Sequence, residues 1–301
     1  MLSCPVWRQS HTQALTICGR ARAEAAGATE EELVESAEAC ILCGSCAPIC
    51  PRGIQTQQLT ISLRQRLAEK GFFPGGDSAG QAKLSVPKAG GRVFFPGAEL
   101  RQRKEVLDRC LQLLGGENLC LCDDGKGICQ ELESGRLAGG KELDAFLEPL
   151  QGAKEIIASD GLMVNLLNLL LGSKVLVRSL GEALLANDRV RSGLQKTDFY
   201  IIETRAFNSR HVDLVMLYEL LKRKTGCFMN LDLQRVATPT AAQSYQHRHD
   251  LATVVNVEEQ VRWLLEGRPA KRIVVEHLVD GAAFEKYADL PVVHLCEVAE
   301  P

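Results

Sequence analysis

The chain has 301 residues, a formal net charge of −3 and an ordinary globular composition, with 46% apolar and 24% charged residues. This length suits two or three modest domains, each large enough to bury a hydrophobic core. No run of Lys or Arg is long enough to follow a phosphate backbone, so the composition argues against nucleic acid as a partner.

The most apolar stretch, residues 161–172, contains two asparagines and is too short to cross a membrane, so we expect a buried helix there. The N-terminal residues contain no apolar run of the kind found in secretory signals. We therefore expect a cytoplasmic location, or a peripheral one at the inner face of the membrane. In such a reducing compartment, twelve cysteines indicate metal or cluster chemistry rather than disulfides.

The first 70 residues are expected to be helical. Thr29 and Glu32 have the spacing of a capping box in front of a helix over residues 33–39. Further along, leucines recur at every fourth position from Leu59 to Leu67, with Arg64 and Arg66 between them, which predicts an amphipathic helix. A segment rich in Gly and Pro follows, and it is expected to be a linker.

The remaining sequence alternates between strand-like and helix-like segments. Strands are predicted at residues 92–95, 154–158, 174–177, 198–202, 271–275 and 291–295, and helices at about 99–114 and 209–224. Segments of the second half match those of the first at an offset of about 105 to 117 residues, as expected for two copies of one α/β unit. The predicted architecture is a helical ferredoxin-like domain, a linker and two α/β repeats with small, mostly parallel sheets, over residues 1–70, 71–91, 92–193 and 194–301.

Four cysteines form the most informative motif. Cys40, Cys43, Cys46 and Cys50, followed by Pro51, have the spacing C-x2-C-x2-C-x3-C-P, which is that of bacterial ferredoxins. Two-residue gaps let one turn of backbone direct three thiolates toward one cluster. Structural zinc sites usually use two separated C-x2-C pairs or mixtures of Cys and His. The motif therefore predicts a [4Fe–4S] cluster on Cys40, Cys43 and Cys46.

The fourth ligand has two candidates. In two-cluster ferredoxins, the last cysteine of one motif binds the other cluster, which would leave Cys50 for a second cluster and require a distant Cys-Pro. Cys4-Pro5 is such a pair, so we favour Cys4, with local ligation by Cys50 as the alternative. Cys4 also has the position of the last cysteine of a second motif. One cluster is expected in this chain, and a second if further cysteines precede Met1.

These residues resemble a known family. Cys4-Pro5 and the motif over residues 40–54 are similar to the N-terminal module of the iron–sulfur subunits of glycolate oxidase. They also resemble the corresponding module of anaerobic glycerol-3-phosphate dehydrogenase, lactate-utilisation proteins and heterodisulfide reductase. The resemblance is specific from residue 4 to about residue 68 and weak beyond it. In that family, the second part is a pair of cysteine-rich α/β repeats.

The repeats of this chain depart from that family's pattern. Ala98 stands where the first repeat should have its first cysteine, Cys129 is the one cysteine where a Cys-Cys-Gly is expected, and residues 158–163 have none. In the second repeat, residues 203–206 and 237–240 take the places of the cysteine signatures. Without paired thiolates, we expect neither repeat to hold an additional cluster.

The resemblance implies an electron-transfer subunit that accepts electrons from a flavoprotein partner and passes them to a quinone or another iron–sulfur protein. No catalytic residue is predicted, because the chemistry on the organic substrate would belong to the partner. Two alternatives remain: a thiol/disulfide enzyme of the heterodisulfide reductase type that uses Cys129 or its neighbours, and a structural protein whose cluster only stabilises the helical domain.

Overall fold

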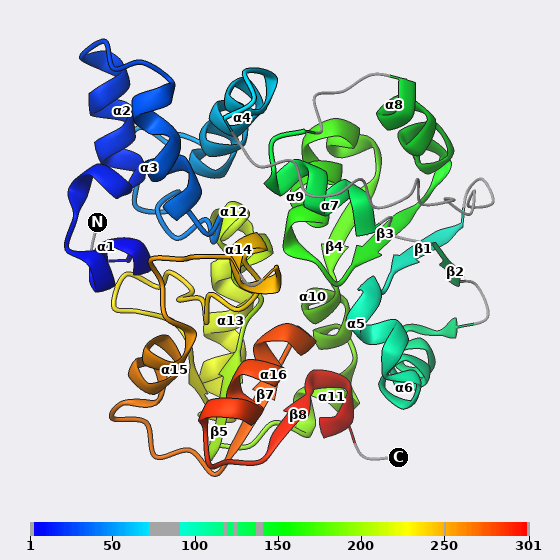
Figure 1. Cartoon of the computed structure of the whole chain (residues 1–301). Coiled ribbons are helices and arrows are strands. Elements are labelled where there is room, and N and C mark those ends of the chain that lie inside the picture. Colours follow the sequence, from blue (N-terminus) through cyan, green and yellow to red (C-terminus); the bar gives the residue numbers. More distant parts are fainter. Residues whose placement is uncertain are drawn as a thin grey trace.

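The computed structural model describes residues 3–72, 91–116, 119–122, 126–136, 141–249 and 251–299. A helical N-terminal region lies against two units that each contain a small sheet, as Figure 1 shows. The predicted fold class is confirmed, because the described strands form two four-stranded, fully parallel sheets. Most of the predicted linker, 71–91, lies outside the described residues.

The N-terminal region is built from α1 (Pro5–Ser10), α2 (Ile17–Ala25), α3 (Val34–Ala39) and α4 (Thr56–Glu69). The capping box is present, since the Thr29 N–H donates to the Glu32 carboxylate at 2.8 Å and the Glu32 N–H donates to Thr29 Oγ1 at 3.4 Å. A short 3₁₀ turn, Glu31–Leu33, then leads into α3. Helix α3 therefore begins within one residue of the start that the capping box predicts.

Helix α4 forms as predicted, but two of its side chains contradict the expected amphipathic pattern. Leu59 is 46% exposed, whereas Arg64 is only 1% exposed. The reason is that the Arg64 guanidinium donates to carbonyl oxygens of Ala37, Cys40 and Glu133, which satisfy its donors inside the protein. A residue expected on the polar face of the helix is thus a buried link between segments.

The first α/β unit has short elements. They are β1 (Arg92–Phe95), α5 (Gly97–Gln102), α6 (Lys104–Leu114), β2 (Leu119–Leu121), α7 (Lys126–Glu133), α8 (Lys141–Leu147), β3 (Glu155–Ala158), α9 (Gly161–Leu171), β4 (Leu176–Ser179), α10 (Leu180–Leu185) and α11 (Asp188–Ser192). The helix predicted over 99–114 is in fact two helices, α5 and α6, separated at Arg103, whose backbone leaves the helical region with ψ of 76°.

The second unit repeats this pattern. It contains β5 (Asp198–Ile201), α12 (Thr204–Ser209), α13 (His211–Thr225), β6 (Phe228–Met229), α14 (Tyr245–Arg248), α15 (Val257–Leu265), β7 (Arg272–Val275), α16 (Leu278–Tyr287), β8 (Val292–His294) and a terminal 3₁₀ helix, η6 (Leu295–Val298). Helix α13 ends at Gly226, whose φ of 72° suits a glycine C-cap.

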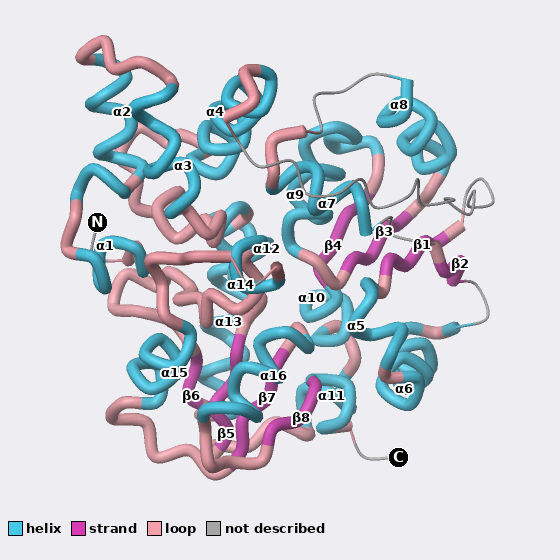
Figure 2. The backbone as a smooth tube through the Cα atoms, in the orientation of Figure 1, coloured by secondary structure: helices cyan, strands magenta, loops and turns pink. Residues whose placement is uncertain are grey.

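The two sheets have the same strand order, β2-β1-β3-β4 and β6-β5-β7-β8. The edge strands β2 and β6 were not predicted, since they have only three and two residues. Figure 2 shows the strands of the two sheets as separate groups. The identical order is what two copies of one α/β unit would give.

One face of each sheet packs into a hydrophobic core that the two units share. Phe94 of β1 and Ile157 of β3 belong to the same buried cluster as Tyr200 of β5 and Val274 of β7. Alternate strand residues point to separate cores: those of the first sheet pack with α9, and those of the second with α15 and α16. Because both faces of each sheet are covered, the strands read as continuous apolar runs.

Helix α9 is the buried helix expected at 161–172, although Leu169 and Leu170 reach the surface. Among the helices of the described ranges, none combines the length and apolar character that crossing a bilayer requires.

Candidate metal centre

The cysteine motif forms a tight loop between α3 and α4. Cys40 is the C-cap of α3 and has extended backbone. Two residues of the loop, Leu42 and Gly44, have positive φ values of 51° and 74°. A Cβ on Gly44 would lie 2.9 Å from Gln57 Nε2, so glycine meets both the backbone and the packing requirement here.

Side chains from two other elements hold this loop. Gln57 of α4 donates to the Leu42 carbonyl oxygen at 2.7 Å. Asn208 of α12 donates to the Cys43 carbonyl oxygen at 3.1 Å and to the Ala237 carbonyl oxygen at 2.9 Å. The loop is therefore attached to the second α/β unit as well as to its own helices.

Cys4 reaches the loop from the N-terminus. It is the N-cap residue of α1, and α1 is fixed to the second unit through Gln9, which donates to the Asn256 carbonyl oxygen at 3.1 Å. Cys4 and Cys43 pack against the same buried cluster, which also contains Val255 of the second unit. The fold thus brings the N-terminal Cys-Pro to the motif.

The thiols of Cys4, Cys40, Cys43 and Cys46, called the cysteine quartet below, influence one another electrostatically. Burial, together with the neighbouring Cys4 thiol, raises the pKa of Cys43 to about 12. Burial also raises the pKa of Cys46, with Cys43, Cys40 and Cys4 adding to the effect. The pKa of Cys4 is raised by burial and by Cys40. Each thiol of the quartet is therefore close to at least one other.

Cys50 lies in a different environment. Its pKa is lowered by backbone N–H groups of Ile54, Arg52 and Gly53. No thiol of the quartet affects the pKa of Cys50, whereas the thiols within the quartet affect the pKa values of one another. The structure brings together the remote Cys4 and three cysteines of the motif, and it leaves the fourth motif cysteine aside.

Two buried guanidinium groups face this set of thiols. Burial opposes ionisation of Cys40, but the positive charges of Arg20 and Arg64, together with hydrogen bonds from the Leu42 N–H and the Thr60 hydroxyl, lower the pKa of that thiol. Arg20 is 3% exposed and donates to neutral oxygens of Leu15, Ser36 and Thr60. Among the described residues no carboxylate pairs with Arg20, and its Nε has no hydrogen-bond partner. Because an uncompensated buried charge is costly, the site is suited to an anionic group.

The distances between the sulfur atoms bear on whether the quartet is arranged for a single zinc ion or for a cluster. Four sulfurs around one zinc ion lie about 3.8 Å apart, as follows from a Zn–S distance near 2.3 Å. In the described residues, no three members of the cysteine quartet have their sulfurs all within 4.8 Å of one another. The quartet has the ligand type that a multi-iron cluster needs and is not gathered as tightly as the ligands of a single zinc ion, so the residues present fit a [4Fe–4S] group.

Comparison with known proteins agrees with this geometry. Residues 33–56 match the family described as 4Fe-4S binding domain. No curated protein and no solved structure matches the chain significantly. The chain therefore carries a 4Fe–4S type site, and the class that this site defines is an iron–sulfur protein. The match supports a role in electron transfer.

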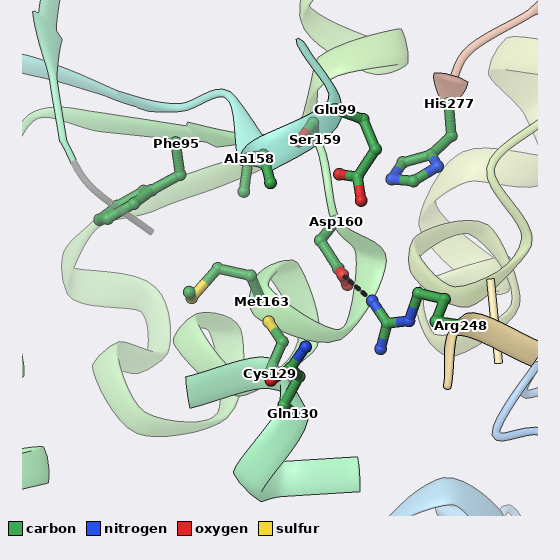
Figure 3. Close-up of a pocket in the computed structure, with 12 residues that line it drawn as sticks. Phe95, Glu99, Cys129, Gln130, Ala158, Ser159, Asp160, Met163, Arg248 and His277 are labelled. Atoms are coloured by element: carbon green, nitrogen blue, oxygen red, sulfur yellow. Dashed lines mark ion pairs between the residues drawn. The ribbon is translucent and has the colours of Figure 1, made fainter. Parts of the chain in front are cut away.

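The segments of the first repeat that lack the expected cysteines line one pocket. The pocket has a volume of about 270 Å³, and Ala98 is among its lining residues. Figure 3 shows Cys129, Asp160 and Arg248 around it. Arg248 lies 3.9 Å from an Asp160 oxygen and also pairs with the buried Glu133. Where the sequence resemblance would place further thiolates, this chain has an ion-pair network.

At the equivalent place in the second repeat, the side chains are buried and form an ion pair. Arg205, within the 203–206 segment, is 1% exposed and pairs with Glu133 at 2.5 Å. Residues 237–240 instead contact the cysteine loop, since Ser45 Oγ donates to the Ala237 carbonyl oxygen at 3.1 Å. The second repeat therefore supports the metal centre with its backbone.

No sequence pattern predicts Arg20, Arg64 or Asn208 as parts of the site. Arginine and asparagine are usually exposed, and neither their spacing nor their neighbours distinguishes these three from surface residues.

Proposed function

We propose that this chain is the electron-transfer iron–sulfur subunit of an oxidoreductase, with one [4Fe–4S] cluster bound by Cys4, Cys40, Cys43 and Cys46. The convergence of the remote Cys4 with the three motif cysteines is the observation that carries this proposal. Bound there, the group supplies reversible one-electron chemistry.

The chain's own residues hold the ligands and set their electrostatic environment. Gln57 and Asn208 fix the backbone of the loop, which limits reorganisation of the ligands. Arg20 and Arg64 place positive charge beside Cys40, which favours the more negative, reduced state.

The cysteine quartet also lies near the surface. Its four residues are half-buried, and the segment 51–55, which follows the motif, is exposed. A redox partner can therefore approach the site closely. We propose that a flavoprotein subunit donates electrons here and that a quinone or another iron–sulfur protein accepts them, as the resemblance to glycolate oxidase subunits suggests.

Two substitutions test the ligand assignment. Cys4→Ala should abolish the electron paramagnetic resonance signal of the reduced cluster, whereas Cys50→Ala should largely keep it. Both variants are purified and reconstituted without oxygen, and iron and sulfide are measured alongside the spectra. If Cys50→Ala loses the signal and Cys4→Ala retains it, the assignment is wrong.

Redox titration tests the relay. The proposal expects a cluster that cycles reversibly and that a flavoprotein can reduce. A cluster that cannot be reduced without unfolding would favour a structural role. Disulfide reductase activity that is lost in Cys129→Ser would favour the thiol/disulfide enzyme, for which the pocket offers only Cys129 among its described lining residues.

A further inference from the structure

A second group of metal-binding side chains lies between the two repeats. Cys110 is in α6 of the first unit, while His294 ends β8 and Cys296 lies in η6 of the second. All three are at most 2% exposed. Their ligand atoms lie within 4.8 Å of one another, and they are the one such group among the residues that the structure describes.

The hydrogen bonds of His294 orient its ring for binding. Its Nε2 lies 3.1 Å from the Glu276 carbonyl oxygen, which can only accept, so Nε2 carries the proton. The backbone N–H of Cys296 donates weakly to Nδ1 at 3.3 Å, which agrees with an unprotonated Nδ1. The Nδ1 lone pair thus faces the thiols, and a backbone carbonyl behind the ring is a frequent partner of metal-binding histidines.

The distances are close to those of a tetrahedral site. His294 Nδ1 lies 3.1 Å from Cys296 Sγ and 4.0 Å from Cys110 Sγ. With Zn–S near 2.3 Å and Zn–N near 2.0 Å, a tetrahedral zinc ion needs about 3.6 Å between sulfur and nitrogen. Shifts of roughly half an ångström in two side chains would therefore complete the geometry.

Neighbouring contacts hold the two segments in place. Arg109, next to Cys110, donates through Nε to the Cys296 carbonyl oxygen at 2.9 Å and also bonds the Ala299 carbonyl oxygen. The C-terminal segment is thereby fixed on α6 whether or not a metal is bound. The three ligands therefore come from segments that hydrogen bonds hold together.

We propose that Cys110, His294 and Cys296 bind a zinc ion that joins the first repeat to the C-terminal segment of the second. Two thiolates, a neutral imidazole and Zn²⁺ have no net charge together, which suits a buried site, whereas monovalent copper would leave a buried negative charge. With three protein ligands, water takes the fourth position. The site is separate from the cysteine quartet and does not depend on the proposed electron transfer.

The test uses the full chain with its iron–sulfur cluster reconstituted, so that zinc cannot occupy the cysteine quartet. The protein is incubated without oxygen with one equivalent of ZnCl₂, passed over a chelating resin, and analysed for zinc and iron by mass spectrometry. Wild type should retain about one zinc per chain. The Cys110→Ser/Cys296→Ser double variant should retain none while keeping its iron. Cys227→Ser, which removes another buried cysteine of the second unit, should retain zinc as wild type does.

Zinc-edge X-ray absorption of the wild-type protein gives a readout that needs no variant. Two sulfur and two nitrogen or oxygen ligands would support the site. Four sulfur ligands would mean that the zinc occupies the cysteine quartet, and this would overturn the proposal. Wild type that retains no more zinc than the double variant would overturn it too, as would recovery of Cys110 and Cys296 as a disulfide from protein handled without oxygen.

Discussion

Replacing Arg64 by Met should lower the reduction potential of the cluster. The Arg64 guanidinium is buried, donates to the Cys40 carbonyl oxygen and lowers the pKa of the Cys40 thiol. Methionine has a similar length and no charge, so the variant removes one positive charge from beside the ligand. Reduction adds an electron to an already negative group, and that step becomes less favourable without the charge.

The size of the effect follows from Coulomb's law. For an assumed separation of about 7 Å and an effective dielectric constant of about 20, one charge contributes about 2.4 kcal/mol, or about 100 mV for a one-electron couple. Arg64→Met should therefore shift the midpoint down by about 100 mV. Arg20→Met should shift it in the same direction, because Arg20 also lowers the pKa of Cys40.

Redox titration followed by electron paramagnetic resonance measures the shift in protein reconstituted without oxygen. Arg66→Met is the matched control, since Arg66 is on the same helix but is 40% exposed and pairs with Glu24 and Glu30. Its potential should change little. Equal potentials for wild type and Arg64→Met, at full iron content, would refute the role of this charge.

Three further changes probe the support of the site and the buried charges. Gly44→Ala should destabilise the loop by roughly 1–2 kcal/mol because of its positive φ alone, and the clash with Gln57 should add to this cost. Gly53 also has positive φ but has nothing within 4 Å of an added Cβ, so Gly53→Ala measures the backbone cost by itself. Denaturant unfolding of both variants gives the two losses of stability, and equal losses would exclude a packing role for Gly44. Asn208→Ala removes the hydrogen bonds to Cys43 and Ala237, so it should cost about 2–4 kcal/mol and speed loss of iron to a chelator; unchanged release would contradict its supporting role. Burial raises the pKa of Glu203 to about 8 from its ordinary 4.5, so the native state keeps a proton that the unfolded chain releases. The free energy of unfolding should therefore fall by up to about 4 kcal/mol as the pH rises from the ordinary pKa to the raised one. Glu203→Gln should lack this part of the decline when unfolding is measured at about pH 5 and pH 8.5, and a slope equal to that of wild type would show that Glu203 is ionised.

The local sequence was sufficient for the main strands and for the type of metal site. The four-residue strand 92–95 was located to the residue, because a buried parallel strand is a continuous apolar run bounded by turn residues. The spacing of Cys40, Cys43 and Cys46 indicated a [4Fe–4S] site for the same local reason, since one turn of backbone positions all three ligands. Strands β2 and β6 were missed because two or three residues contain too little pattern.

Only the tertiary structure decided which distant residues meet. Cys4 lies beside the motif because α1 is attached to the second unit, and Arg64 is buried because carbonyl groups of three separate segments converge on it. In the same way, Cys110 and Cys296 are 186 residues apart in the sequence and come together only where α6 packs on the C-terminal segment. Periodicity and spacing describe neighbours along the chain, whereas these contacts depend on how the helices and sheets pack, which no local pattern contains.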